Sequence, residues 1–376
     1  MDGLSAVVDL AAQLIACDTS HGGEDDALHL IATQLTAAGF DLHWVPWRPG
    51  RSNLVAHHAH GAAFTFAAHL DTVPFTADGW SFDPLGAQVL DGRLYGRGSS
   101  DMKAATAAML LAAVDAAERG CRPFSMVFTS GEETGCHGAR AVHGRHLLHT
   151  DPLLIVGEAT GNQLRLGHKG ATWLEVNATG RSAHGSRPDL GVNAIEMISA
   201  LITRLSLATA ADATLGPSHP LLGSPTVNVG TITGGQQTNL VPDHCQMSLD
   251  VRTVHPDNLA AVLKLLHHEG VVLTETVNVP SVWSEPSTAT AQAVLRAVQR
   301  STGRPQEPRS VPYFTDGAVL AGRQPHVFII GPGDPDQPHT TDESCSVVLL
   351  HEAVSVYTEL LTSWDTGQLT PTHPAH

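Results

Sequence analysis

The stretch "FSMVFTSGEETG" at residues 124–135 is the part of this sequence that decides the fold. Its apolar run is typical of a buried strand, and the small turn that follows places Glu132 and Glu133 side by side. Two adjacent negative charges at the end of a buried strand are unfavourable unless a cation offsets them. We therefore expect a cationic group opposite this pair.

Similar apolar runs recur on both sides of this stretch. Strands are predicted at residues 40–46, 53–58, 63–70, 153–158 and 326–333, and helices at residues 4–16, 25–39, 101–120, 287–303 and 343–364. Strands that alternate with helices predict an α/β fold with a mostly parallel sheet covered by helices.

The pattern changes in the middle of the chain. Strands are predicted there at residues 171–180, 226–235 and 244–253, and helices at residues 191–206 and 255–270. We therefore predict an α/β domain formed by residues 1–170 and 283–376. A second, α+β domain formed by residues 171–282 is inserted into it.

Composition excludes several classes of partner. The chain has 376 residues and a formal net charge of −16, which argues against nucleic acid and anionic membranes as partners. No apolar run reaches the roughly 18 residues that span a bilayer, and the first basic residue is Arg48, so a signal peptide is not expected. Five widely spaced cysteines form no disulfide framework, which favours the cytoplasm.

Chemically versatile side chains follow the predicted strands. In an open α/β sheet, ligands gather beyond the carboxyl ends of the strands. The residues that follow them here are His69, Asp71, Asp101, Glu132, Glu133, Glu158 and His339. Taken singly, each has a plainer explanation, such as a helix N-cap for Asp101 or a solvated turn for Glu132.

Taken together, these residues predict a metal site. Two imidazoles and three carboxylates fit a pair of divalent ions that share one bridging carboxylate. Zinc suits this mixture of nitrogen and oxygen donors, and cobalt or manganese could replace it. One glutamate of the adjacent pair can bind metal while the other acts as general base. Asp71 is expected on the same strand face as His69, accepting its other imidazole N–H.

Five motifs now point to a known family. They are "HLDTVP" (69–74), "YGRGSSDMKAA" (95–105), "TSGEETGCHGAR" (129–140), "VGEAT" (156–160) and "PGDPDQPHTTDE" (332–343). They resemble the signature blocks of the acetylornithine deacetylase and succinyl-diaminopimelate desuccinylase family, which also includes aminoacylase and glutamate carboxypeptidase. The resemblance implies a zinc-exopeptidase-like catalytic domain with two metal ions, an inserted lid and dimerisation domain, and a homodimer.

The resemblance also implies a role for each site residue. It assigns five metal ligands: His69 and Glu158 on one ion, Glu133 and His339 on the other, and Asp101 between them. Asp71 would support His69, and Glu132 would be the general base that activates water.

Two blocks of the inserted domain resemble substrate-binding segments of the family. "SAHGSRPDLGVNAIE" (182–196) implies that His184 reaches the active site of the partner subunit. "QQTNLVPD" (236–243) and "LDVR" (249–252) imply that Asn239 and Arg252 hold the substrate carboxylate. Without the resemblance, Asn239 would be interpreted as a turn residue and Arg252 as part of a surface ion pair.

The resemblance implies hydrolysis of the amide bond of a small N-acyl amino acid. N-acetylornithine is the first candidate, because the layout "SPTVNVGTITGG…LDVRT" is similar to that branch. Succinyl-diaminopimelate, other acetylated amino acids and dipeptides remain alternatives. Departures at "SSDMK", "PYFTDGAVL" and "HTTDES" keep the proposed ligands but leave the substrate open.

Three other interpretations are compatible with parts of the sequence. Ser100 and Lys103 form an S-x-x-K pattern that a serine amidase would use, although its companion motifs are lacking. Cys136 and His137 are candidate extra ligands, against a buried thiol and a turn histidine. A binding protein built on a hydrolase scaffold is the non-enzyme alternative.

Overall fold

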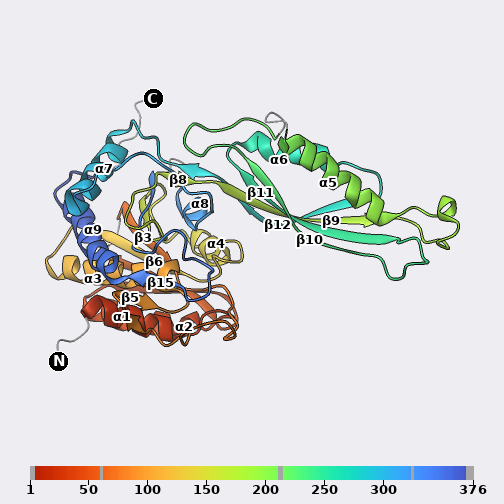
Figure 1. Ribbon diagram of the computed structural model, residues 1–376. Helices are drawn as coiled ribbons and strands as arrows, with labels where there is room; N and C mark the ends of the chain where they lie inside the picture. The colour runs from red at the N-terminus through yellow and green to blue at the C-terminus, as the bar shows by residue number, and fades with distance from the viewer. Residues whose placement is uncertain (1–4, 60–61, 211–214, 323–325, 370–376) are drawn as a thin grey trace. The chain divides into compact units, whose positions relative to one another are not determined.

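The computed structural model describes residues 5–59, 62–210, 215–322 and 326–369 (Figure 1). The chain divides into two compact units. Unit 1 comprises Met1–Gly167, Val282–Ser310 and Thr315–His376, and unit 2 comprises His168–Ser281 and Val311–Phe314. Compared with the boundaries expected from the sequence, residues 168–170 and 311–314 join unit 2, and Val282 joins unit 1.

A six-stranded sheet forms the centre of unit 1. Its order is β1 (Asp41–Arg48), β2 (Arg51–His58), β6 (Phe124–Thr129), β3 (Phe64–His69), β7 (Leu153–Val156) and β14 (His326–Ile329). The last four strands run parallel, while β2 is antiparallel to both of its neighbours. Every residue of these four parallel strands is buried, as expected of a sheet covered on both faces. The predicted mostly parallel sheet is confirmed.

Helices cover this sheet (Figure 1). Their bounds are α1 (Ala6–Ala16), α2 (Glu24–Ala37), α3 (Ala104–Glu118), α4 (His137–His143), α7 (Ala289–Thr302), α8 (Gly317–Leu320) and α9 (Val347–Asp365). Helices α1, α3, α7 and α9 pack together as one group, and α4 packs against α8, β1 and β2. Helix α3 is rich in alanine and buried along most of its length, so it can lie close to its neighbours.

Two predicted helix starts close to the site are wrong. The helix predicted from residue 101 begins at Ala104, because η1 (Ser99–Lys103) departs from helical geometry at Asp101 and Met102. The helix predicted from residue 343 begins at Val347. Ser344–Ser346 instead forms strand β15, which pairs with β5 (Arg93–Tyr95), and β5 pairs in turn with β4 (Val89–Leu90).

Unit 2 contains an antiparallel sheet with helices on one face. The strand order is β10 (Thr226–Gly234), β11 (His244–Thr253), β9 (Gly170–Thr179) and β12 (Val271–Val279). Helices α5 (Ala194–Ala210) and α6 (Pro256–Leu266) share one core with this sheet, so the apolar face of α5 packs within its own unit. Three short elements remain: η2 (Pro188–Leu190), β8 (Gly167–His168) and β13 (Val282–Trp283). Within the described ranges, no helix combines the length and apolar character needed to cross a membrane.

Candidate active site

The parallel strands of unit 1 deliver the proposed ligands to one edge of the sheet. His69 is the last residue of β3, Glu132 and Glu133 follow β6, and Glu158 follows β7. His339 lies on the loop after β14. Because β6, β3, β7 and β14 are neighbours and parallel, their carboxyl ends meet at the same edge.

Asp101 joins these side chains into two donor groups. One group is His69, Asp101 and Glu158, and the other is Asp101, Glu133 and His339. Within each group, the ligand atoms lie within 4.8 Å of one another. The two oxygens of Asp101 face different imidazoles, with Oδ1 3.0 Å from His69 Nε2 and Oδ2 3.4 Å from His339 Nε2. This is the arrangement expected of a carboxylate between two ions.

The orientation of His69 shows that the group of His69, Asp101 and Glu158 requires a cation. Its Nδ1 donates to the backbone carbonyl of Asp71 at 2.9 Å, which leaves Nε2 to face Asp101 Oδ1. In a neutral imidazole with this tautomer, Nε2 carries a lone pair, as does the carboxylate oxygen. Two lone pairs at 3.0 Å repel unless a cation lies between them. The donor set therefore fits either a proton or a metal ion at this point.

The surroundings of the titratable groups indicate the same need for positive charge. Burial raises the pKa of Glu158 well above its usual value, and the charge of Asp101 adds to this effect. Burial lowers the pKa of His69, but a hydrogen bond with Asp101 and the charge of Glu158 outweigh it and hold that pKa well above normal. Hydrogen bonds to Asp101 and then Glu133 raise the pKa of His339 to about 10. Divalent ions would neutralise the same carboxylates.

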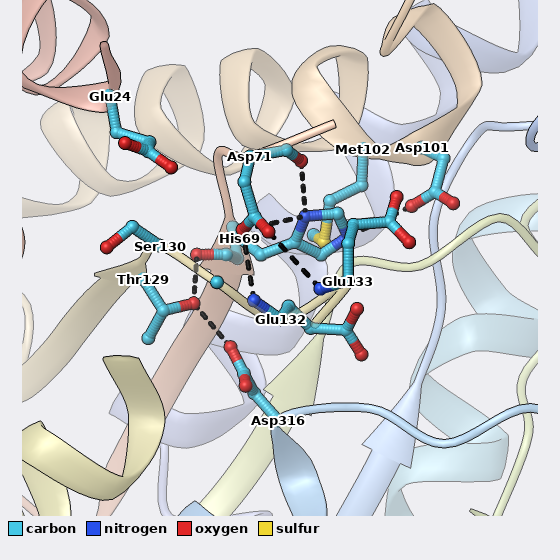
Figure 2. A network of polar contacts seen from close by, with 12 residues as sticks. Glu24, His69, Asp71, Asp101, Met102, Thr129, Ser130, Glu132, Glu133 and Asp316 are labelled. Carbon is cyan, nitrogen blue, oxygen red and sulfur yellow. Dashed lines mark hydrogen bonds and ion pairs between the residues drawn. The ribbon is translucent and has the colours of Figure 1, made fainter. Parts of the chain in front are cut away.

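The turn that carries Glu132 and Glu133 is fixed by Asp71 (Figure 2). The Asp71 carboxylate accepts the backbone N–H of Glu132 at 3.1 Å and of Glu133 at 3.2 Å. Its Oδ1 lies 3.8 Å from His69 Nδ1, so the support of His69 comes from the Asp71 carbonyl instead. The expected strand position and carboxylate hydrogen bond are thus wrong, because β3 ends at His69 and the Asp71 carboxylate binds the turn after β6 instead.

Glu132 is buried beside the two donor groups but belongs to neither. Only 5% of its surface is exposed. Burial raises its pKa well above normal, and the charges of Glu158 and Glu133 contribute further while His69 opposes them. A carboxylate held next to a metal site without joining it is suited to proton transfer.

Two acidic residues close to the site, Asp316 and Glu343, were not identified as site residues from the sequence. Asp316 accepts a hydrogen bond from Thr129 Oγ1 behind the glutamate turn (Figure 2), and burial raises its pKa to about 6. Glu343 accepts the backbone N–H of Asp101, from which it is separated by 242 residues. Nothing in the local sequence distinguishes either from a solvated loop residue, since the partners come from distant segments.

Comparison with known proteins identifies the family. Residues 65–363 match the profile of peptidase family M20/M25/M40. The chain belongs to this family. An acetylornithine deacetylase of Vibrio vulnificus is 30% identical over 351 residues, which cover 90% of this chain and 91% of the relative. A succinyl-diaminopimelate desuccinylase of Cereibacter sphaeroides is 29% identical over 380 residues, with 94% and 97% coverage.

Solved structures show the fold that accompanies this family. A dinuclear metal-binding M20 peptidase of Bacillus subtilis aligns with a TM-score of 0.69 and 15% identity, covering 96% of this chain and 99% of that one. As an M20/M25/M40 member, the protein is a metal-dependent hydrolase of amide bonds.

Two alternatives from the sequence do not fit this M20/M25/M40 site. Ser100 Oγ donates to the Ser344 carbonyl and Lys103 Nζ to the Cys17 carbonyl, so each member of the S-x-x-K pattern has a separate structural partner. Among the described residues, no candidate metal group includes Cys136 or His137. Cys136 is buried, and the His137 ring stacks on Trp47 with centroids 5.3 Å apart.

Unit 2 separates the three residues that the family resemblance assigned to substrate. His184 and Asn239 lie together, because His184 bridges to Leu240 and the Gly185 N–H donates to the Asn239 carbonyl at 2.8 Å. They connect to the end of the sheet where His244 pairs with Thr179. Arg252 lies near the other end of β11. At roughly 3.3 Å per residue, it is about 26 Å from His244 along the strand. There it binds Asp250 at 2.8 Å, so one copy of unit 2 does not bring Asn239 and Arg252 together.

The two hydrogen bonds that the Asp71 carboxylate accepts from Glu132 and Glu133 lead to a first prediction. In Asp71→Asn, the side-chain nitrogen cannot accept the second backbone N–H, so the turn with Glu132 and Glu133 loosens. We expect kcat/KM to fall by about 10–100-fold, as when other partners of metal ligands are removed. Steady-state kinetics measure this loss. The control is Asp83→Asn, because Asp83 also accepts a backbone N–H, from Leu85 at 3.0 Å, but lies outside both groups. Equal losses in the two variants would contradict the assignment.

Proposed function

We propose that this protein removes the acyl group from a small N-acyl amino acid, with N-acetylornithine as the first candidate substrate. The observation that carries the proposal is the pair of donor groups sharing Asp101, with Glu132 buried beside them. The similarity to an acetylornithine deacetylase over 90% of the chain supports the substrate class.

The proposed metal ligands are the members of the two donor groups. His69 and Glu158 would hold one ion, Glu133 and His339 would hold the other, and Asp101 would contribute to both. Mixed nitrogen and oxygen donors favour zinc, which cobalt or manganese could replace. Bound there, two divalent ions would supply Lewis acidity to the amide carbonyl and to the attacking water.

The residues of the chain carry out the proton transfers in this proposal. Glu132 takes a proton from the water whose oxygen attacks the acyl carbon. When the carbon–nitrogen bond breaks, Glu132 passes that proton to the leaving amine. Asp71 keeps Glu132 in place by accepting its backbone N–H. The products are a free carboxylic acid and a free amino acid.

Substrate recognition is proposed to require a homodimer. His184 would stabilise the developing oxyanion in the active site of the partner subunit. Asn239 lies beside His184, whereas Arg252 lies near the opposite end of the sheet, about 26 Å from His244 along β11. This separation favours contributions from two subunits to one substrate carboxylate. Strand β10 offers a surface for association, because it is an edge strand, mostly exposed, and carries Ile232 with 52% of its surface accessible.

Mixing two inactive variants tests this contribution between subunits. We expect Glu132→Gln and His184→Ala to be inactive alone, but their heterodimers contain one intact site. Random exchange of subunits should restore about a quarter of wild-type activity. Light scattering and a tag on one variant verify that heterodimers form. Heterodimers without restored activity would show that His184 does not act across the interface.

The substrate is tested by amine release from Nα-acetylornithine and N-succinyl-diaminopimelate in parallel assays with the zinc- or cobalt-loaded protein. Preference for acetylornithine confirms the proposal and places the protein in arginine biosynthesis. Preference for the succinyl substrate supports the second candidate, which the 29% identity to a desuccinylase favours. Activity on neither, in protein with two bound metals, rejects both in favour of another acyl amino acid or a dipeptide.

Five free cysteines support a cytoplasmic location.

A further inference from the structure

Glu343 is a buried carboxylate that the proposed reaction does not use. None of its surface is exposed. It follows His339 by four residues but belongs to neither donor group. A buried charge of this kind is costly unless several donors bind it. Its partners therefore indicate what it does.

Four N–H donors bind the two oxygens of Glu343. Oε1 accepts the backbone N–H of Ser100 at 2.8 Å and of Asp101 at 3.0 Å. Oε2 accepts the backbone N–H of Gly98 at 3.0 Å and the Arg97 guanidinium at 2.6 Å. Three of the four donors thus belong to one short segment of backbone, which ends at the shared ligand Asp101.

This segment needs an external acceptor. Asp101 and Met102 have non-helical backbone angles within η1, and Gly98 adopts a φ of 84°. The irregular turn precedes the first regular turn of α3, so its N–H groups are not all satisfied within a helix. The Glu343 carboxylate supplies the missing acceptors. Without it, the backbone N–H groups of Gly98, Ser100 and Asp101 would lose this acceptor.

The same contacts join the two loops that carry ligands. The Glu343 carbonyl accepts the N–H of Gly96 at 2.9 Å, and the Ser344 carbonyl accepts Ser100 Oγ at 2.9 Å. The loop that carries His339 is therefore fastened, through Glu343 and Ser344, to the segment that carries Asp101. Glu343 acts here as Asp71 does on the glutamate turn: it is a carboxylate that holds the backbone of ligand residues.

We propose that Glu343 is a positioning residue for the metal pair, which fixes Asp101 through its backbone. The inference rests on the proposed dinuclear site. Because Asp101 belongs to both donor groups, its displacement weakens both metal positions together. Loss of His339 would instead weaken one position, since His339 belongs to one group.

Three variants separate the contacts of Glu343. In Glu343→Gln, the single side-chain oxygen is expected to stay with Gly98 and the Arg97 guanidinium, whose charge gives the stronger hydrogen bond, so the contacts to Ser100 and Asp101 are lost. Glu343→Ala removes all four hydrogen bonds. Arg97→Met keeps the three backbone contacts and removes the ion pair. The matched control is Glu352→Ala, because Glu352 binds Asn162 at 2.9 Å and Arg304 at 2.7 Å and lies outside both donor groups.

The measurement is titration of the metal-free, full-length protein with cobalt, followed by its visible absorption, with circular dichroism to verify folding. We expect Glu343→Ala to bind both cobalt equivalents about 10–100-fold more weakly, which is usual for a lost partner of a metal ligand. Glu343→Gln should show a smaller loss at both equivalents. Arg97→Met and Glu352→Ala should stay close to wild type.

Several results would overturn the inference. A folded Glu343→Ala with wild-type cobalt affinity would do so, as would a loss confined to one equivalent. An equal loss in Arg97→Met would assign the effect to the ion pair. If Glu343→Ala does not fold, Glu343→Gln decides, and wild-type affinity there rejects the proposal. Wild-type protein that binds fewer than two cobalt ions would reject the dinuclear site itself, which separates that failure from failure of the Glu343 role.

Discussion

Glu132→Gln is expected to lose about 10²–10⁴-fold in kcat/KM, the usual contribution of a general base, while it keeps both metal ions. The amide has nearly the shape of the carboxylate but cannot take a proton from water. Glu132 lies outside both donor groups, so its loss leaves the ligands in place. Steady-state kinetics and metal analysis of the same preparation measure the two effects.

The adjacent residue is the matched control for this prediction. Glu133→Gln removes a member of one donor group, so we expect it to lose metal as well as activity. Both residues sit on the same turn and are held by the same Asp71 carboxylate. A Glu132→Gln protein that keeps more than a small part of wild-type turnover would falsify the base assignment. Loss of metal from Glu132→Gln would show that it is a ligand.

The second large effect is expected at the shared ligand. Asp101→Ala should lose high-affinity binding at both metal positions, whereas His339→Ala and Glu158→Ala should each lose one. The reason is that Asp101 alone belongs to both groups. Metals contribute several kcal/mol to such reactions, so we expect Asp101→Ala to be at least about 10³-fold slower. Metal stoichiometry by atomic emission distinguishes the three variants.

Thermal stability provides an independent measure of the same loss. A ligand that binds only the native state at about 1,000 times its Kd adds about 4 kcal/mol to the free energy of unfolding. A chelator should therefore lower the Tm of the wild type and leave the Tm of Asp101→Ala nearly unchanged. An Asp101→Ala protein that still binds two ions tightly would contradict the bridging role.

The positions of several proposed ligands and of the proposed general base could be predicted from the sequence. His69, Glu132, Glu133 and Glu158 end or follow buried apolar runs, and such runs in an α/β protein become parallel strands whose carboxyl ends meet. This rule predicts the common edge without any knowledge of loop structure. The order of the strands in the sheet then brings these residues close together, because β6, β3, β7 and β14 are neighbours.

The sequence was less informative where the backbone leaves regular structure. The helix expected from Asp101 begins at Ala104, because η1 is stabilised by an acceptor on another loop and not by its own turn. The Asp71 carboxylate was expected to accept from His69, but β3 ends at His69, and this carboxylate accepts the backbone N–H groups of Glu132 and Glu133 instead.

The fold class, the strand ends that carry the site and the residue types that can bind two metals follow from the amino-acid sequence, because hydrophobic periodicity is a local property of each segment and the order of the segments is given along the chain. The three-dimensional structure was needed to show which carboxylates bind backbone, as Asp71 and Glu343 do, and that His184 and Asn239 connect to the end of the sheet opposite Arg252. These facts depend on strand register and on hydrogen bonds between distant segments, such as Gly98 and Glu343, which are 245 residues apart, and no single segment specifies them.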